Sequence, residues 1–191
     1  MIRAHQRTNA GGGLFGRALC LPVLTAILCL GAGGEGQCGT TVKDVLISVR
    51  TLGFLKNPPE GLSDFAVIYD PANPDSTRDK TAVYDAIDGG TPIGPAIIRT
   101  APIPVTELHR IKNYRYILIT SGIDSYIPKI RQMIQGSGIV TITTNLNYVA
   151  SGDCVLGVSS DPKVQVLLNR NAASDAAVSF STSFRMMIQE M

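Results

Sequence analysis

Side chains that could carry out catalysis are few in this sequence, and their spacing assembles no reactive set. Beyond residue 36 the only histidine is His109, which stands among charged neighbours on a short predicted helix, where a solvated surface position is expected. Asp85 and Asp88 lie three residues apart on another predicted helix, a spacing typical of a solvated charged face. The sequence contains no Gly-x-Ser-x-Gly nucleophile motif and no phosphate-binding loop, and its one Gly-rich tract (residues 11–16) lies in the N-terminal segment. It therefore predicts a protein that is not an enzyme and that uses no cofactor.

The four cysteines have no spacing typical of a metal site. Cys20 and Cys29 lie in an apolar N-terminal segment, which leaves Cys38 and Cys154 in the body of the chain. In an oxidising compartment these two residues could form a disulfide, which would stabilise the fold by roughly 2–4 kcal/mol. The alternative is that both thiols are buried and unpaired, and the sequence leaves both alternatives open.

Small polar residues follow three predicted strands, at the positions where an open parallel sheet binds ligands. Asp70 ends the first of these strands, Ser121 and Gly122 follow the second, and Asn145 follows the third. Exposed amides and hydroxyls at the helix N-termini beyond such strands form a ready site for a small anion. The alternative is that Asp70, Ser121 and Asn145 cap the helices that follow, which is the more common role of these residue types.

Residues 1–36 have the order of a secretory signal peptide. The first 17 residues carry three arginines and no acid, an apolar stretch (18–33) follows, and cleavage is expected among small residues between Ala32 and Gln37. The apolar core of about 16 residues is shorter than the roughly 20 that a membrane-spanning helix needs, so an uncleaved anchor is the less favoured alternative. We therefore expect residues 37–191 to form a domain that works in the periplasm.

The formal net charge of +2 comes from the leader. Residues 1–36 hold three arginines and one glutamate, and without them the 17 basic and 15 acidic residues become 14 and 14. A neutral body offers no basic stripe that could follow a phosphate backbone, so nucleic acid is not an expected partner. The same residues contain no basic amphipathic segment that would hold a membrane surface.

Hydrophobic periodicity predicts strands that alternate with helices. The apolar runs at 65–70 and 114–120 lack alternation, as expected for strands buried on both faces. Pro102 and Pro104 place the end of a further strand outside the interior of a sheet. Strands are expected over residues 65–70, 96–105, 114–120, 138–144, 154–159 and 163–169, and helices over 41–56, 74–88 (with Asp75 or Ser76 as N-cap), 106–111, 124–136 and 180–189.

This order of elements predicts the α/β fold class. We expect one three-layer, Rossmann-like domain with a mostly parallel sheet and helices on both of its faces. The last two strands are separated by Ser160, Asp161 and Pro162, which indicates a C-terminal antiparallel hairpin. Residues 40–191 contain no internal repeat and no linker, so a single domain is expected.

The C-terminal part has a recognisable order of apolar and small residues. It runs from a predicted strand through a Gly-containing loop into a hairpin, a small-residue segment and a terminal helix, at Ile139–Thr144, Gly152, Val155–Val158, Val164–Asn169, Ala172–Ala173 and Val178–Ile188. This order resembles that of YfiR-like periplasmic proteins, and the helix leading through GFLKNPP resembles the helix of that family that ends in an aromatic–Pro segment. The resemblance implies a non-enzymatic regulator that binds and represses the periplasmic domain of a membrane-anchored diguanylate cyclase.

The sequence also departs from that family and resembles a second one. It has no tryptophan, and Lys56–Asn57 precede Pro58 where YfiR-like proteins often have Trp before Pro. Residues 65–76 (FAVIYDPANPDS) are similar to the first strand and turn of ABC-type solute-binding proteins, which close two lobes around a ligand. Residues 37–191 would supply one such lobe, so this resemblance implies a single-lobe carrier of a small ligand.

We therefore expect a regulator that docks on a membrane-anchored partner through apolar burial with a polar rim, since a neutral chain offers little steering. The alternative is a small-solute carrier that uses Asp70, Ser121, Gly122 and Asn145. The sequence leaves open whether two copies form a homodimer.

Overall fold

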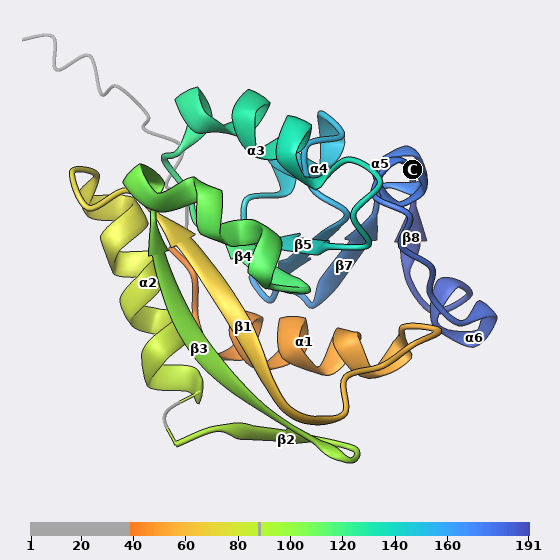
Figure 1. Cartoon of the computed structure of the whole chain (residues 1–191). Coiled ribbons are helices and arrows are strands. Elements are labelled where there is room, and N and C mark those ends of the chain that lie inside the picture. Colours follow the sequence, from red (N-terminus) through yellow and green to blue (C-terminus); the bar gives the residue numbers. More distant parts are fainter. Residues whose placement is uncertain (1–38, 88) are drawn as a thin grey trace, which may run out of the picture. The chain divides into compact units, whose positions relative to one another are not determined.

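Stretches rich in β-branched and aromatic residues form the strands of this protein, and apolar residues at helical spacing form its helices (Figure 1). The computed structural model describes residues 39–87 and 89–191, all of which belong to one compact unit. The predicted leader, its cleavage region, Cys38 and Asp88 lie outside the described residues. No helix in the described part is long and apolar enough to cross a membrane.

An eight-stranded sheet runs through the described residues. Its strands are β1 (Gly61–Tyr69), β2 (Thr91–Ile93), β3 (Ala96–Pro104), β4 (Tyr116–Ile119), β5 (Val140–Thr143), β6 (Leu156–Ser159), β7 (Gln165–Leu168) and β8 (Gln189–Glu190). They lie in the order β2-β3-β1-β4-β5-β6-β7-β8. The neighbours from β3 to β6 pair in parallel, and β6 and β7 pair antiparallel, which confirms the predicted C-terminal hairpin.

Helices cover both faces of the sheet, as the α/β fold class requires (Figure 1). The longer α-helices are α1 (Val42–Thr51), α2 (Pro74–Ile87) and α3 (Ile127–Ile134), and the shorter ones are α4 (Leu146–Ala150), α5 (Arg170–Asp175) and α6 (Thr182–Arg185). The 3₁₀ helices are η1 (Leu52–Phe54), η2 (Val105–Asn113) and η3 (Asp124–Tyr126). α1 and α2 pack into one hydrophobic cluster, and η2, α3 and α4 pack into a second cluster on the other face. The predicted three-layer architecture is confirmed.

The first helix shows how local sequence sets these boundaries. Thr41 and Asp44 form a capping box, in which the Thr41 side chain accepts a hydrogen bond from the Asp44 amide (3.2 Å) and the Asp44 carboxylate accepts one from the Thr41 amide (2.8 Å). Val45, Val49 and Leu52 recur at helical spacing and are fully buried. The helix therefore begins and packs where the periodicity predicted.

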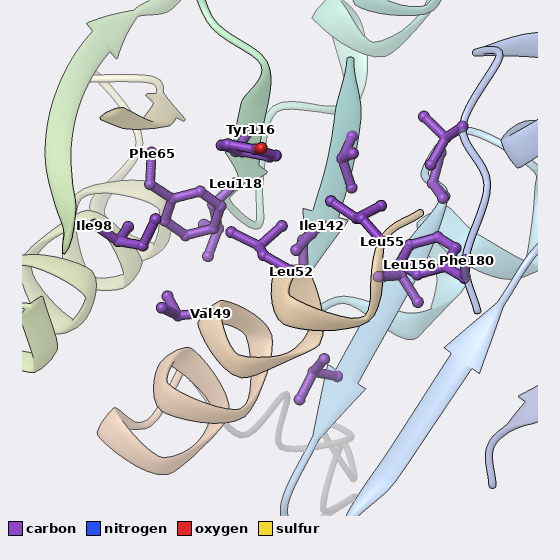
Figure 2. Packing of buried hydrophobic residues seen from close by; sticks show 14 of the residues in the cluster. Val49, Leu52, Leu55, Phe65, Ile98, Tyr116, Leu118, Ile142, Leu156 and Phe180 are labelled. Atoms are coloured by element: carbon purple, nitrogen blue, oxygen red, sulfur yellow. The ribbon is translucent and has the colours of Figure 1, made fainter. Parts of the chain in front are cut away.

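Strand β1 is buried on both faces in its second half. Phe65 and Val67 belong to the cluster beneath α1 and α2, whereas Ala66 and Ile68 belong to the cluster on the other face. Figure 2 shows Phe65 near Leu52, the first residue of η1, in the first of these clusters. The absence of polar alternation in FAVIY thus reflects burial on two sides, as predicted.

The end of β3 lies at an edge of the described sheet. β3 pairs with β1 along its whole length, but β2 covers only Ala96–Ile98 on the outer side. No strand in the described sheet pairs with the outer side of β3 at Pro102 and Pro104. The backbone N–H group that a proline lacks is therefore not needed there. This arrangement confirms that the two prolines stand outside the interior of the sheet.

The helix predicted over 180–189 is wrong in its extent. α6 ends at Arg185, and the chain then enters β8, which pairs in parallel with β7. Phe180 and Phe184 are buried with ring centroids 5.3 Å apart, but Met186 and Met187 are exposed. No continuous apolar face is available to hold a longer helix, so the chain forms one turn and a short strand instead.

Candidate ligand-binding cleft

The order of the strands creates a topological switch point between β1 and β4. The chain leaves β1, pairs β3 on one side of it, and returns to place β4 on the other side. The segments that follow β1 and β4 therefore lead to helices on opposite faces of the sheet. Open parallel sheets form ligand sites at such points. Asp70 begins the first loop, and Ser121 and Gly122 belong to the second.

The loop after β1 is shaped by Asx turns. The Asp70 carboxylate accepts a hydrogen bond from the Ala72 amide at 2.9 Å. The Asn73 side-chain oxygen accepts from the amides of Asp75 (2.9 Å) and Ser76 (3.2 Å), so Asn73 caps α2. The predicted N-cap, Asp75 or Ser76, is thus wrong by two or three residues, because Pro74 occupies the first helical position and the cap must precede it.

The loops after β1 and β4 touch at Gly122. The Asn73 side-chain amide donates a hydrogen bond to the Gly122 carbonyl at 3.1 Å. Gly122 has a φ of +74°, and a Cβ added there would lie 2.5 Å from the Asn73 side-chain nitrogen. This position therefore requires glycine both for its backbone conformation and for the close approach of Asn73.

A buried hydroxyl pair joins the same loops below the surface. Ser76 Oγ accepts a hydrogen bond from the Asp70 amide (2.8 Å), and Thr120 Oγ1 donates to the Ile68 carbonyl (2.9 Å). The two hydroxyl oxygens are 2.6 Å apart. The Thr120 hydroxyl already donates its proton to the Ile68 carbonyl, so Ser76 Oγ must donate to Thr120 Oγ1. Both hydroxyl groups are therefore hydrogen-bonded.

The carboxylate of Asp79, on α2, anchors the β4 loop from beneath. It is 1% exposed and accepts hydrogen bonds from the Ser121 amide (2.8 Å) and the Thr40 amide (3.0 Å). Two amide donors compensate the burial of this carboxylate. The Ser121 amide is therefore already satisfied from within the protein.

A cleft of about 500 Å³ lies above these contacts, at the carboxyl edge of the sheet. Ser121, Gly122 and Asn145 line it, so the structure brings together three of the four predicted ligand-binding residues. Asp70 belongs to the adjoining turn and is not among the lining residues. The complete lining is Asp75, Ser121, Gly122, Asp124, Ile127, Pro128, Asn145, Asn147, Tyr148, Ser151 and Asp153.

The cleft does not favour the anion that the sequence predicted. Amides near it are already bonded within the protein: the Asn147 amide donates to Asn145, which caps α4 (3.1 Å), the Ala72 amide donates to Asp70, and the Ser121 amide donates to Asp79 of α2. Three carboxylates line the cleft, and no lysine or arginine does so in the described part of the chain. Asn145 thus has the capping role that was the alternative.

The three carboxylates differ in their partners. Asp75 forms an ion pair with Arg78, and Asp153 lies 3.7 Å from Arg131. Asp124 forms no ion pair within residues 39–87 and 89–191. Asp124 is therefore the carboxylate in the cleft with which a bound cation could pair without displacing an arginine of the described chain.

Tyr148 lies against Asp124 in the wall of the cleft. Its side chain is 5% exposed, and its hydroxyl completes no hydrogen bond with the described residues. Burial, followed by the neighbouring Asp124 carboxylate, raises the pKa of this hydroxyl. Neither residue could be singled out from the sequence, because Tyr148 has the pattern of one apolar position in LNYVA and Asp124 that of the start of a helix.

The remaining predicted residues lie away from the cleft. His109 is exposed on η2, and Asp85 is exposed on α2. Cys154 is fully buried just before β6, and burial raises the pKa of its thiol. Since Cys38 lies outside the described residues, the Cys38–Cys154 disulfide stays a prediction. No group of three His, Cys, Asp or Glu side chains in the described ranges is placed to hold a metal ion.

Comparison with known proteins identifies a fold but no family. No family model matches the chain, so the resemblance to YfiR-like proteins gains no support there, and no curated protein matches it either. A structure from Streptococcus pneumonia described as an ABC domain in complex with L-Trp aligns with a TM-score of 0.56 at 10% identity, over 78% of this chain and 61% of that one. A conserved domain protein from Vibrio cholerae aligns with a TM-score of 0.54 at 12% identity, over 78% of this chain and 59% of that one.

These similarities define the class of the fold. At 10–12% identity they show a shared α/β architecture and nothing finer. The chain spans about three fifths of the length of the two structures. It therefore shares with them a Rossmann-like α/β fold with a mostly parallel sheet.

Proposed function

We propose that this domain binds a small solute in the cleft at the carboxyl edge of its sheet, without converting it, after export to the periplasm. The observation that carries the proposal is the cleft itself, which lies at the carboxyl ends of β4 and β5, beside the switch point, and is lined by Ser121, Gly122 and Asn145. Its volume of about 500 Å³ falls within the roughly 300–1,000 Å³ of small-molecule sites. A domain of similar fold holds a small molecule, L-Trp, which supports the same class of function here.

The lining favours a solute that carries a positive charge. An ammonium group would bind the Asp124 carboxylate, and the side chains of Ser121 and Asn145 offer polar partners nearby. A solute carboxylate would meet Asp75, Asp124 and Asp153 without a lysine or arginine among the described lining residues. The proposed ligand is therefore a small amine rather than a dicarboxylate or a phosphate ester.

A panel of solutes tests this proposal by calorimetry and thermal shift. Small amines, zwitterionic amino acids and dicarboxylates are titrated into the purified protein, and we expect saturable binding of at least one amine. Asp124→Asn should weaken that binding about fivefold, because an exposed charge pair contributes about 1 kcal/mol to the binding free energy. Asp161→Asn is the matched control, because Asp161 is an exposed aspartate outside the cleft.

The outcomes separate the two parts of the proposal. Binding of dicarboxylates alone would leave the cleft as a solute site but refute its preference for amines. No binding from any class would refute solute binding, and conversion of a bound solute would show that the protein is an enzyme.

A regulator of the YfiR type is the second candidate. The segment that carries that resemblance ends in Met186 and Met187, which are 77% and 66% exposed and could enter an apolar contact with a partner. Recovery of a membrane-anchored cyclase by the protein from solubilised membranes, lost in Met186→Ser/Met187→Ser, would favour this function. Recovery of no such partner, together with solute binding, would favour the carrier.

A further inference from the structure

A second and larger hollow lies at the opposite edge of the sheet. It has a volume of about 820 Å³ and is formed by loops that precede β4 and β5, by the segment after η1, and by the turn between α5 and α6. Because β4 and β5 are parallel, the starts of both strands face this hollow and their ends face the solute cleft. We call this hollow the amino-edge groove.

All of the charged side chains that line the amino-edge groove in the described structure are positive. Lys56, Lys112 and Arg115 line it, and no aspartate or glutamate does so among its described residues. None of the three cations forms an ion pair with a carboxylate of the described chain. A body with equal numbers of acidic and basic residues thus concentrates three unpaired cations in one hollow, while carboxylates line the cleft at the other edge.

Arg115 is held in place by its surroundings. Its guanidinium donates a hydrogen bond to the Asn57 carbonyl at 3.2 Å and lies over the Tyr116 ring, 5.8 Å from the centroid. These contacts use part of the guanidinium and restrict its motion, so less entropy is lost when its remaining donors bind an anion. The backbone amide of Lys56 is fixed by a hydrogen bond to the Ser179 carbonyl at 3.0 Å, which positions the base of the second cation.

The groove continues into a neighbouring hollow of about 630 Å³. The two hollows share Lys56, Asn57, Asn113, Tyr114 and Arg115, so they form one continuous trough. Two of the three cations, Lys56 and Arg115, belong to both parts. The second part also contains Glu60 and Asp64, and Asp64 lies 3.5 Å from Arg99. The two joined hollows leave room for an extended chain, whose acidic residues would lie in the first part, because that part has no carboxylate among its described lining residues.

We propose that the amino-edge groove docks an acidic, extended polypeptide segment of a partner protein. Carboxylates of the segment would pair with Lys56, Lys112 and Arg115, and the positive field of the groove would steer its approach. The proposal is independent of solute binding, because the two sites lie at opposite edges of the sheet. Partner and solute therefore bind at the same time without competing for residues.

Fluorescein-labelled octaglutamate tests this docking by anisotropy, with octalysine as the reversed-charge peptide. We expect saturable binding of octaglutamate only, weakened as salt rises from 20 to 300 mM because the charges are exposed. Lys56→Gln/Lys112→Gln should weaken binding roughly 2- to 25-fold, since each exposed pair contributes roughly a 1.4- to 5-fold effect. Neither side chain makes another polar contact in the described chain, so the variant should fold normally.

Lys129→Gln/Lys163→Gln is the control, because it removes the same charge from exposed positions outside the trough. Equal weakening in the control and in Lys56→Gln/Lys112→Gln would overturn the proposal, as would the absence of saturable binding to octaglutamate. Displacement of the peptide by inorganic phosphate at equal concentration would instead indicate a small-anion site. Capture by phosphatidylglycerol vesicles without peptide binding would indicate a membrane contact, and both results would overturn docking of a peptide.

Discussion

Replacing Gly122 by alanine tests the geometry that joins the two loops of the cleft. At φ +74° an alanine costs about 1–2 kcal/mol relative to a right-handed conformation. The new Cβ would also lie 2.5 Å from the Asn73 side-chain nitrogen, which must move and give up its 3.1 Å hydrogen bond to the Gly122 carbonyl. That loss adds about 1 kcal/mol, so Gly122→Ala should lower the free energy of unfolding by about 2–3 kcal/mol.

Gly89 provides a matched control for the backbone term. It has the same φ of +74°, but a Cβ there would meet nothing within 4 Å in the described structure. Gly89→Ala should therefore cost only the conformational term, about 1–2 kcal/mol. Urea denaturation of both variants measures the difference, provided that the slope m stays constant.

A double-mutant cycle with Asn73→Ala completes the test. Without the Asn73 side chain the alanine at position 122 has no atom to displace, so the two changes together should cost about 1 kcal/mol less than their sum. Equal costs for Gly122→Ala and Gly89→Ala, or full additivity with Asn73→Ala, would refute the reasoning about close approach.

Two further predictions concern buried titratable groups. Tyr148→Phe should raise the free energy of unfolding at pH 7 by about 1 kcal/mol, because it removes a buried hydroxyl that completes no hydrogen bond with the described residues. Burial and Asp124 raise the pKa of this hydroxyl above 10.0, so the unfolded chain loses the proton at a lower pH than the folded protein does. The free energy of unfolding should therefore fall as pH rises past 10, and Tyr148→Phe should reduce that fall. Cys154 should resist a water-soluble thiol reagent at pH 8 in the native protein, because burial raises its pKa above 9.0. Two free thiols at positions 38 and 154 after denaturation without reductant would rule out the predicted disulfide.

The strands and long helices could be predicted because their residues are buried in simple patterns. YILI in β4 is apolar at every position since helices pack on both faces, and α1 repeats its apolar residues at helical spacing. The short elements could not be predicted in the same way. β2 (TPI), α4 and α6 span only three to five residues, which is too short for hydrophobic periodicity to set their bounds.

The place of the cleft could also be predicted, but its chemistry could not. The rule for parallel sheets placed Ser121, Gly122 and Asn145 at the edge where the cleft lies. The buried supports come from positions far apart in sequence, such as Asp79, which bonds the Ser121 amide 42 residues away. One signal was available in the sequence, since Pro74 at the first helical position points to Asn73 as the cap.

The most direct test of solute binding in the cleft is an amide NMR titration with the amine that binds best in calorimetry. The account predicts saturable shifts at Ser121, Gly122 and Asn145, with the amides of Asn113 and Gly138 at the amino edge unchanged. Shifts confined to Asn113 and Gly138, with the cleft amides unmoved at saturation, would contradict it.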